Sequence, residues 1–319
     1  MYSRIIGTGR YLPEKIVSND DLSKFLDTSD DWIYPRTGIR YRHIADKEGS
    51  YDMASYAALK ALENANVNAE EIDLIILATI TAEYQTPSIA CIVQKQIKAT
   101  NAMCLDINAA CTGFVYGLDI VDQFIASGKY KKALVIGVEK LSHTMNWEDK
   151  STCILFGDGA GAVVVEASEE KGIIDVVNHS IGEDWDALTY EIQHEKTPFY
   201  ETQRENGFNM DGRKVFDFAT KKVRESIKEV LEKNKTDIND IDLFVLHQAN
   251  ERIINRIAKK LEVDIDKFYM NMKYYGNTSS ASIPIALDEL REKNMLEGKK
   301  VVLSGFGAGL TYGSSIIQF

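Results

Sequence analysis

The chain alternates between two patterns of apolar and polar positions. Continuous apolar runs, typical of strands whose two faces are both covered, predict strands near 73–80, 102–108, 133–139, 241–246, 268–272 and 300–305. Segments whose apolar residues recur every three or four positions predict helices near 52–65, 88–98, 112–127, 215–234, 250–261 and 281–293. Such alternation predicts an α/β fold with parallel sheets and crossover helices.

One unit is used twice. Residues 61–77 (ALENANVNAEEIDLIIL) and 230–246 (VLEKNKTDINDIDLFVL) align without a gap, displaced by 169 positions from residue 61 to residue 230. KKALVIG at 131–137 and KKVVLSG at 299–305 repeat at a displacement of 168. Any α/β chain can contain similar helix–strand joints, but two segments at nearly one displacement favour an internal duplication.

The duplication predicts two α/β halves, 1–170 and 171–319. Glycine-punctuated strands at 154–167 and 310–319 close them. No Pro/Ser-rich linker separates the halves, so we expect them to pack as one body. Residues 180–212 fit neither half and are predicted to form an inserted, loop-rich cap.

Composition and charge exclude several classes of function. The formal net charge of -11 argues against general nucleic-acid binding, which depends on phosphate neutralisation. No run of apolar residues is long enough for a membrane span. The first residues (MYSRIIG) predict a strand rather than a signal peptide. We therefore expect a cytoplasmic protein that works away from the membrane. Its four cysteines match no zinc pattern, so we expect free thiols and no metal.

Cys111 has the setting of a nucleophile. An apolar strand ends at Ala109 and Ala110, and an apolar-periodic helix begins at Thr112. A thiol at a helix N-terminus meets unpaired N–H groups and a dipole that favour the thiolate, which lowers its pKa. The other cysteines lie in an expected helix (Cys91) or in apolar strands (Cys104 and Cys153), where a thiol is usually a small buried hydrophobe.

Two residues of the second half occupy related positions. His247 follows the apolar run IDLFVL, at the carboxyl end of a predicted parallel strand where ligand sites gather. Asn277 follows the predicted strand FYMNM and precedes a helix, as Cys111 does in the first half. A hydrogen bond to the backbone would equally explain His247, and helix capping would equally explain Asn277. If the halves are related by a pseudo-twofold axis, Cys111 and Asn277 reach a shared cleft.

Glycine-rich strand edges follow in each half. The backbone amides of SGFGAGLTYG (304–313) could face a developing oxyanion. GDGAGA at 157–162 precedes a strand rather than a helix, which argues against a phosphate-binding loop.

Taken together, the chain resembles the thiolase-fold condensing enzymes, and within them the β-ketoacyl-acyl-carrier-protein synthase III family, over nearly its whole length. The segments that carry the resemblance are DDWIYPRTGIRYRHIA (30–45), DINAACTGF (106–114), FGDGAGAVV (156–164), HQANERII (247–254), GNTSSASIPIAL (276–287) and GFGAGLTYG (305–313). The resemblance implies two thiolase-like halves packed as a layered αβαβα body.

The resemblance also implies roles for single residues. Cys111 would carry the acyl group, and His247 and Asn277 would donate hydrogen bonds to the malonyl thioester during decarboxylation. The oxyanion hole would use the amides of Cys111 and Ala308.

For the substrates, the resemblance implies a coenzyme A site and a docking face. Trp32 and Arg36 would hold the adenine by stacking. Lys150 lies at a position where the family often has an arginine that also binds the adenine. Acyl-CoA and malonyl-acyl carrier protein would be the substrates, without a cofactor, and the protein would be a homodimer. A basic face would bind the carrier protein; it comprises Lys214, Arg252, Lys259 and Lys260.

Single positions separate this chain from related subfamilies. Phe306 and Ala308 stand where biosynthetic thiolases carry a second cysteine, and Asn277 stands where elongating synthases carry a second histidine. Ala308 replaces a frequent glycine, and alanine tolerates positive φ less well. Thr86 replaces an aromatic residue that limits the primer in some members, which predicts a roomier pocket for a longer or branched acyl group.

The resemblance implies a decarboxylative Claisen condensation of a short acyl-CoA with malonyl-carrier protein, which initiates fatty-acid synthesis. A secondary-metabolite acyltransferase with a different acceptor would share Cys111 and His247. A catalytically silent acyl-CoA-binding paralogue would have no need to keep the Cys111, His247 and Asn277 set.

Overall fold

The computed structural model describes residues 1–191 and 207–319. Its α-helices are α1 (Asn19–Leu22), α2 (Asp30–Thr37), α3 (Ser50–Ala65), α4 (Ile89–Ile97), α5 (Gly113–Ala126), α6 (Gly212–Lys233), α7 (Glu251–Leu261), α8 (Met272–Tyr275) and α9 (Ser282–Glu292). Its strands are β1 (Tyr2–Tyr11), β2 (Lys15–Ser18), β3 (Tyr41–Ile44), β4 (Leu74–Ala78), β5 (Met103–Ile107), β6 (Lys132–Glu139), β7 (Gly159–Ser168), β8 (Ile173–Ser180), β9 (Leu188–Glu191), β10 (Gly207–Met210), β11 (Leu243–Leu246), β12 (Lys300–Gly307) and β13 (Thr311–Gln318).

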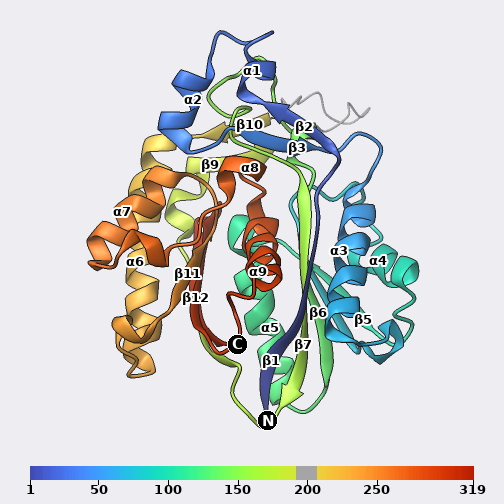
Figure 1. Ribbon diagram of the computed structural model, residues 1–319. Coiled ribbons are helices and arrows are strands. Elements are labelled where there is room, and N and C mark those ends of the chain that lie inside the picture. The colour runs from blue at the N-terminus through green and yellow to red at the C-terminus, as the bar shows by residue number, and fades with distance from the viewer. Residues whose placement is uncertain (192–206) are drawn as a thin grey trace.

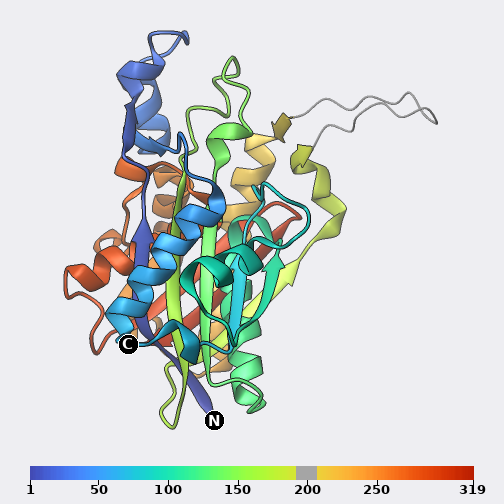
Figure 2. The ribbon, with the colours of Figure 1, turned by 90° about the vertical axis from the view of Figure 1, so that its right-hand side faces the viewer.

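Five layers alternate between helix and sheet (Figure 1). From right to left in that view, α3 and α4 cover a five-stranded sheet, α5 and α9 fill the centre, and α6 and α7 cover a four-stranded sheet. The view turned by 90° shows α3 and α4 in front of the first sheet (Figure 2). The αβαβα arrangement is therefore confirmed, and the central helices are the layer that both sheets share.

The two sheets are mixed, so the expectation of parallel sheets is only partly right. The first has the order β1-β7-β6-β4-β5, in which β6, β4 and β5 are parallel and β7 is antiparallel to both of its neighbours, β6 and β1. The second has the order β11-β12-β13-β8, in which only β11 and β12 are parallel. The antiparallel strands need no crossover helix, because a short connection joins β12 to β13.

Two predicted segments differ from the structure. Residues 268–272 form no strand: Phe268 makes one isolated bridge to Phe244, and α8 begins at Met272. The cap predicted at 180–212 lies partly in 192–206, outside the described residues. Its described parts include β9 and β10, which pair antiparallel, so this region is more regular than a loop.

Local sequence explains where α4 and α7 begin. Ser88 accepts a hydrogen bond from the Cys91 amide as the N-cap of α4, and the Asp106 carboxylate accepts bonds from the next two free amides. Asn250, three positions after His247, caps α7 by accepting a hydrogen bond from the Arg252 amide. These caps fix the helix starts beside the carboxyl ends of β5 and β11. In the described part of the chain, no helix is both long and apolar enough to cross a membrane.

Candidate active site

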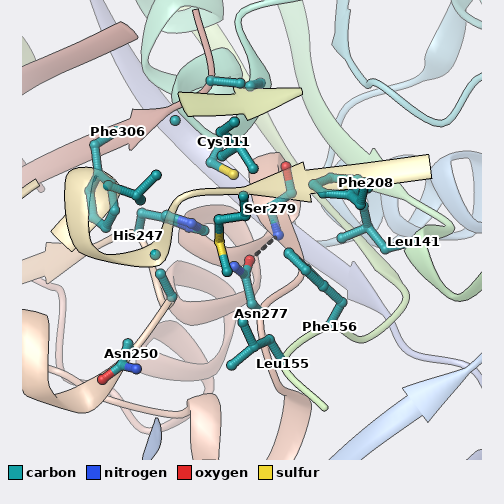
Figure 3. A pocket seen from close by; sticks show the side chains of 18 of the residues that line it. Cys111, Leu141, Leu155, Phe156, Phe208, His247, Asn250, Asn277, Ser279 and Phe306 are labelled. Carbon is teal, nitrogen blue, oxygen red and sulfur yellow. Dashed lines mark hydrogen bonds between the residues drawn. The ribbon is translucent and has the colours of Figure 1, made fainter. Parts of the chain in front are cut away.

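A cavity of about 690 Å³ opens where the two halves meet, within the usual size of a small-molecule site. Cys111 from the first half lines it together with His247 and Asn277 from the second. Figure 3 shows the three side chains around one space. The predicted convergence is therefore present in the structure.

Cys111 lies in a tight turn against β12. The turn is the 3-10 helix Ala110–Thr112, which runs directly into α5. A Cβ atom on Gly307 would lie 2.7 Å from the Cys111 amide nitrogen, so only glycine lets the turn approach this strand. The Thr112 hydroxyl bonds the Thr311 carbonyl at 3.1 Å and ties the turn to β13.

Burial favours the thiol form of Cys111 over the thiolate. Desolvation in the cavity raises the pKa of Cys111 to about 12, and the nearby Glu139 carboxylate raises it further, while a hydrogen bond from Ser279 opposes the change. The expectation of a lowered pKa at the helix N-terminus is therefore wrong. The cause is that burial acts on the whole thiolate charge, whereas the dipole supplies only a partial one.

His247 is a neutral imidazole with one nitrogen held from behind. Its Nδ1 lies 2.8 Å from the Ser282 hydroxyl, and the Phe306 ring packs edge-on at 5.1 Å between centroids. Burial lowers the pKa of His247 to about 3. The ring is therefore suited to donate a hydrogen bond from Nε2 rather than to act as a cation.

Asn277 has its carboxamide oxygen engaged by the backbone. Oδ1 accepts a 2.8 Å bond from the Ser279 amide, which fixes the orientation because an N–H must face the oxygen (Figure 3). Its own backbone bonds Leu155 and Gly157 of the first half. The amide nitrogen of the side chain is left to donate in the cavity.

The internal symmetry pairs Cys111 with Ser280 rather than with Asn277. The 3-10 turn Ser279–Ala281 precedes α9 as Ala110–Thr112 precedes α5, again at a displacement of 169. Both turns start with a residue at positive φ: 46° at Ala110 and 48° at Ser279. Asn277 lies three positions before the equivalent of Cys111, so the two residues meet across the symmetry axis without being equivalents.

The glycine-rich edge forms one wall of the cavity. Gly307, Ala308 and Gly309 line it next to Cys111. The positive φ falls on Gly309, at 124°, and Ala308 is not among the described non-glycine residues with positive φ. The alanine is therefore accommodated without the backbone strain that the sequence suggested. The role of the Cys111 and Ala308 amides as an oxyanion hole stays a prediction.

An aromatic and cationic group lies at the cavity mouth. Trp32 and Arg36 line the cavity, and the Arg36 guanidinium carbon lies 4.7 Å from the centre of the Trp32 ring. Lys150 is not a lining residue, but its Nζ lies 5.5 Å from the same ring and bonds the Asp27 carbonyl at 2.7 Å. The structure thus brings together the three residues predicted to hold adenine.

The predicted docking residues lie on neighbouring helices. Arg252, Lys259 and Lys260 are exposed on α7, beside α6 (Figure 1). Lys214 at the start of α6 differs, because Asp184 binds its Nζ at 2.7 Å and compensates its charge.

Thr86 is exposed and does not line the cavity of its own chain. A role for this residue in primer selection therefore requires that it reach the cavity of another copy. Cys153 lies in a turn rather than in the predicted strand.

Several site residues escaped the sequence reasoning. Glu139 bonds Ser279 and Ser280, and Ser282 bonds His247. Neither residue belongs to a sequence motif that predicts such a contact. Phe208 and Tyr190, from the β9–β10 pair, line the cavity although the sequence suggested only a loop there. The available signal was the alternation of apolar and polar residues in LTYE (188–191) and GFNM (207–210), and four residues are too few to predict a strand. Among the described residues, no group of three or more His, Cys, Asp or Glu could hold a metal ion.

Comparison with known proteins agrees with this geometry. Residues 105–182 match the 3-oxoacyl-[acyl-carrier-protein] synthase III family, and residues 231–319 match its C-terminal part. The chain is 50% identical over 318 residues to a β-ketoacyl-[acyl-carrier-protein] synthase III of Clostridium acetobutylicum, covering 99% of this chain and 98% of that protein. A synthase III of Clostridium novyi is 51% identical over the full length of both.

A solved structure has the same fold. The 3-oxoacyl-[acyl-carrier-protein] synthase III of Aquifex aeolicus superposes with a TM-score of 0.94 at 46% identity, covering 99% of this chain and all of the other. The likeness extends over both halves, so the whole layered body is shared.

Proposed function

Since this chain belongs to the β-ketoacyl-acyl-carrier-protein synthase III family, we propose that it carries out the family's condensation through an acyl group held on Cys111. The chain is a condensing acyltransferase of fatty-acid synthesis. The observation that carries the residue assignment is the convergence of one thiol, one neutral imidazole and one carboxamide on a single cavity.

In the first half-reaction, Cys111 takes the acyl group from acyl-CoA. The sulfur attacks the thioester carbonyl, the amides of Cys111 and Ala308 hold the oxyanion, and coenzyme A leaves as a thiol with the proton that Cys111 gives up. Trp32, Arg36 and Lys150 bind the adenine at the mouth. The reaction needs no cofactor beyond the substrate itself.

In the second half-reaction, malonyl-carrier protein enters the same cavity. His247 Nε2 and the Asn277 amide nitrogen donate hydrogen bonds to the malonyl thioester carbonyl. These bonds strengthen as carbon dioxide departs and the enolate forms, which favours the transition state. The enolate carbon attacks the acyl-Cys111 carbonyl, which gives the 3-ketoacyl-carrier protein, and the Cys111 thiolate takes up a proton.

The decisive experiment separates these steps. Cys111→Ala should accept no acyl group from acyl-CoA, whereas Asn277→Ala should still be acylated but should lose most of the decarboxylation. Intact-mass spectrometry after incubation with acyl-CoA measures the first, and release of labelled carbon dioxide measures the second. Cys91→Ala is the matched control and should behave as wild type. An acyl adduct on Cys111→Ala would end the proposal.

Membership of the family also suggests the partners, which we propose to be an acyl carrier protein and a second copy of this chain. The exposed cations of α7 suit an acidic carrier protein. Strand β5 lies at the edge of its sheet, and its residues Met103 and Leu105 are 37% and 41% exposed. An exposed apolar edge of this kind suits pairing with a second copy of the chain. In such a dimer, the exposed Thr86 would reach the cavity of the partner. Sedimentation of the protein tests the homodimer, and a panel of acyl-CoA donors tests the roomier primer pocket.

We also propose the cytoplasm as the site of action. All four cysteines are free in the structure, as suits a reducing compartment. Cell fractionation tests the location. The secondary-metabolite alternative is not favoured, because the similar proteins of about 50% identity are synthases III.

A further inference from the structure

Glu139 is a buried carboxyl group that the reaction described above does not use. It is the last residue of β6, and its side chain is 0% exposed. In the described part of the chain, hydroxyl and amide donors rather than a cation surround it. Burial of an ionisable group is costly unless hydrogen bonds compensate for the lost water, so the contacts of Glu139 call for an explanation.

One oxygen of Glu139 is held by the first half of the chain. Oε2 accepts hydrogen bonds from the Thr81 hydroxyl at 2.8 Å, the Ile80 amide at 3.1 Å and the Thr79 hydroxyl at 3.3 Å. These three residues follow β4 directly. The carboxylate is thereby anchored to the carboxyl ends of two parallel strands.

The other oxygen is held by the second half. Oε1 accepts from the Ser280 hydroxyl at 2.9 Å and from the Ser279 hydroxyl at 3.1 Å. Ser279 has a φ of 48°, an uncommon value for a residue with a side chain, so its turn needs support from outside. The carboxylate of Glu139 supplies that support across the interface between the halves.

The same turn orients the Asn277 carboxamide. The Ser279 amide donates to Asn277 Oδ1 at 2.8 Å, and this bond leaves the side-chain nitrogen facing the cavity. Ser279 also lines the cavity that Cys111 lines. A displacement of Ser279 would therefore move the donor that the second half-reaction needs.

We propose that Glu139 is a positioning residue of the condensation step, whose carboxyl group holds the Ser279 turn so that Asn277 points at the malonyl thioester. The inference rests on the proposed function. It adds a residue that touches no substrate and acts through Ser279.

The chemistry of the donors favours the ionised form for this task. Five donors face two oxygens, and a carboxylate accepts all five, whereas a neutral amide would direct an NH₂ group at some of them. The Ile80 backbone N–H is a donor with a fixed direction, so in Glu139→Gln the remaining side-chain oxygen must face it. The NH₂ group must then face the two serines. Ser280 has a second acceptor in the Ala78 carbonyl at 3.0 Å. Ser279 can then only accept from the NH₂ group, and this neutral hydrogen bond is weaker than the charge-assisted bond that its hydroxyl donates to the carboxylate.

The test compares the two half-reactions in Glu139→Gln. We expect decarboxylation of malonyl-carrier protein and condensation to slow ~10- to 100-fold, since a shift of about 1 Å at a reacting group has effects of this order. We expect acylation of Cys111, followed by intact mass, to proceed at least as fast as in wild type. Removing the neighbouring charge should also speed alkylation of Cys111 by iodoacetamide at a fixed neutral pH.

Two further variants cover the case in which Glu139→Gln does not fold. Ser280→Ala removes one donor that lies outside the cavity lining, and we expect condensation to slow about two- to tenfold, the effect of one ordinary hydrogen bond. Asp288→Asn neutralises a different buried carboxylate, one that binds Thr8 and Arg10 on β1, and it should leave both half-reactions unchanged.

The outcomes separate this proposal from the function it rests on. A folded Glu139→Gln enzyme with wild-type decarboxylation, beside an Asn277→Ala enzyme that has lost it, would overturn the role of Glu139 alone. Equal slowing of acylation and decarboxylation would also overturn it, because a general structural role predicts that result. If Asn277→Ala itself decarboxylates normally, the residue assignment of the proposed function fails instead.

Discussion

At the scale of single residues, each proposed catalytic group is oriented by a neighbour that does not react. The Ser279 amide fixes the Asn277 carboxamide, and the Ser282 hydroxyl faces His247 Nδ1. Ser282 Oγ already accepts a bond from the Gln248 amide at 3.3 Å, so its own hydrogen is available to Nδ1. We therefore infer that the neutral imidazole carries its proton on Nε2, the nitrogen that the second half-reaction uses.

Replacing Ser282 by Ala should therefore disturb the tautomer of His247. We expect condensation to slow about tenfold while acylation of Cys111 is retained, because only the second half-reaction uses the imidazole as a donor. Nitrogen chemical shifts of the His247 ring measure the tautomer directly. Ser226→Ala is the matched control, since Ser226 is buried and bonds Ser314 away from the cavity. An unchanged tautomer in Ser282→Ala would refute this assignment.

At the scale of elements, close backbone approach decides where the nucleophile sits. The Cys111 turn packs on β12 through Gly307 and Gly305, where a Cβ atom would lie 2.7 Å and 3.0 Å from the turn. The equivalent turn at Ser280 packs on Gly137 of β6. The duplicated sequence therefore repeats a strand glycine in each half, because each half packs its turn on the other half's strand.

Gly307→Ala should push the Cys111 turn away from β12. We expect acylation to slow by ~10- to 100-fold and stability to fall by about 1–3 kcal/mol, the usual cost of overpacking. Stopped-flow release of coenzyme A and chemical denaturation measure the two effects. Gly182→Ala serves as the control, because a Cβ atom there meets no neighbour within 4 Å. Wild-type acylation in a folded Gly307→Ala protein would contradict the packing argument.

At the scale of the whole molecule, burial moves the pKa values of titratable groups in the site away from their values in water. Burial lowers the pKa of His247 to about 3 and raises the pKa of Glu139 to about 7. Each shift links the stability of the fold to pH. For His247, the unfolded state binds the proton more readily, so its contribution to stability is complete above the unfolded pKa of about 6.5 and is lost as the pH falls.

The expected signature is a difference between two proteins. The free energy of unfolding of wild type relative to His247→Gln should decline below about pH 6.5, with a slope of up to about 1.4 kcal/mol per pH unit. Glu139 has the opposite trend, because its raised pKa makes the folded state bind protons more readily between about pH 4.5 and 7, but it is present in both proteins and cancels. Urea denaturation at several pH values measures the slope. A pH-independent difference would show that His247 is not buried in its neutral form.

The order of helices and strands was predictable from the sequence, because apolar periodicity reports which faces are covered. Cys111, His247 and Asn277 were also predictable, since each lies at the junction of a strand and a turn or helix. The strand expected at 268–272 failed, because an apolar run shows that a segment is buried without showing which neighbour supplies its hydrogen bonds.

The sequence by itself determined that two related halves present a thiol, an imidazole and a carboxamide at comparable chain positions. The tertiary structure alone decided that burial raises the pKa of Cys111, that Ser280 and not Asn277 is its symmetry equivalent, and that Glu139 joins the halves behind the site. The physical reason is that desolvation and hydrogen bonding between residues about 60 to 200 positions apart depend on packing, which leaves no periodic trace in the chain.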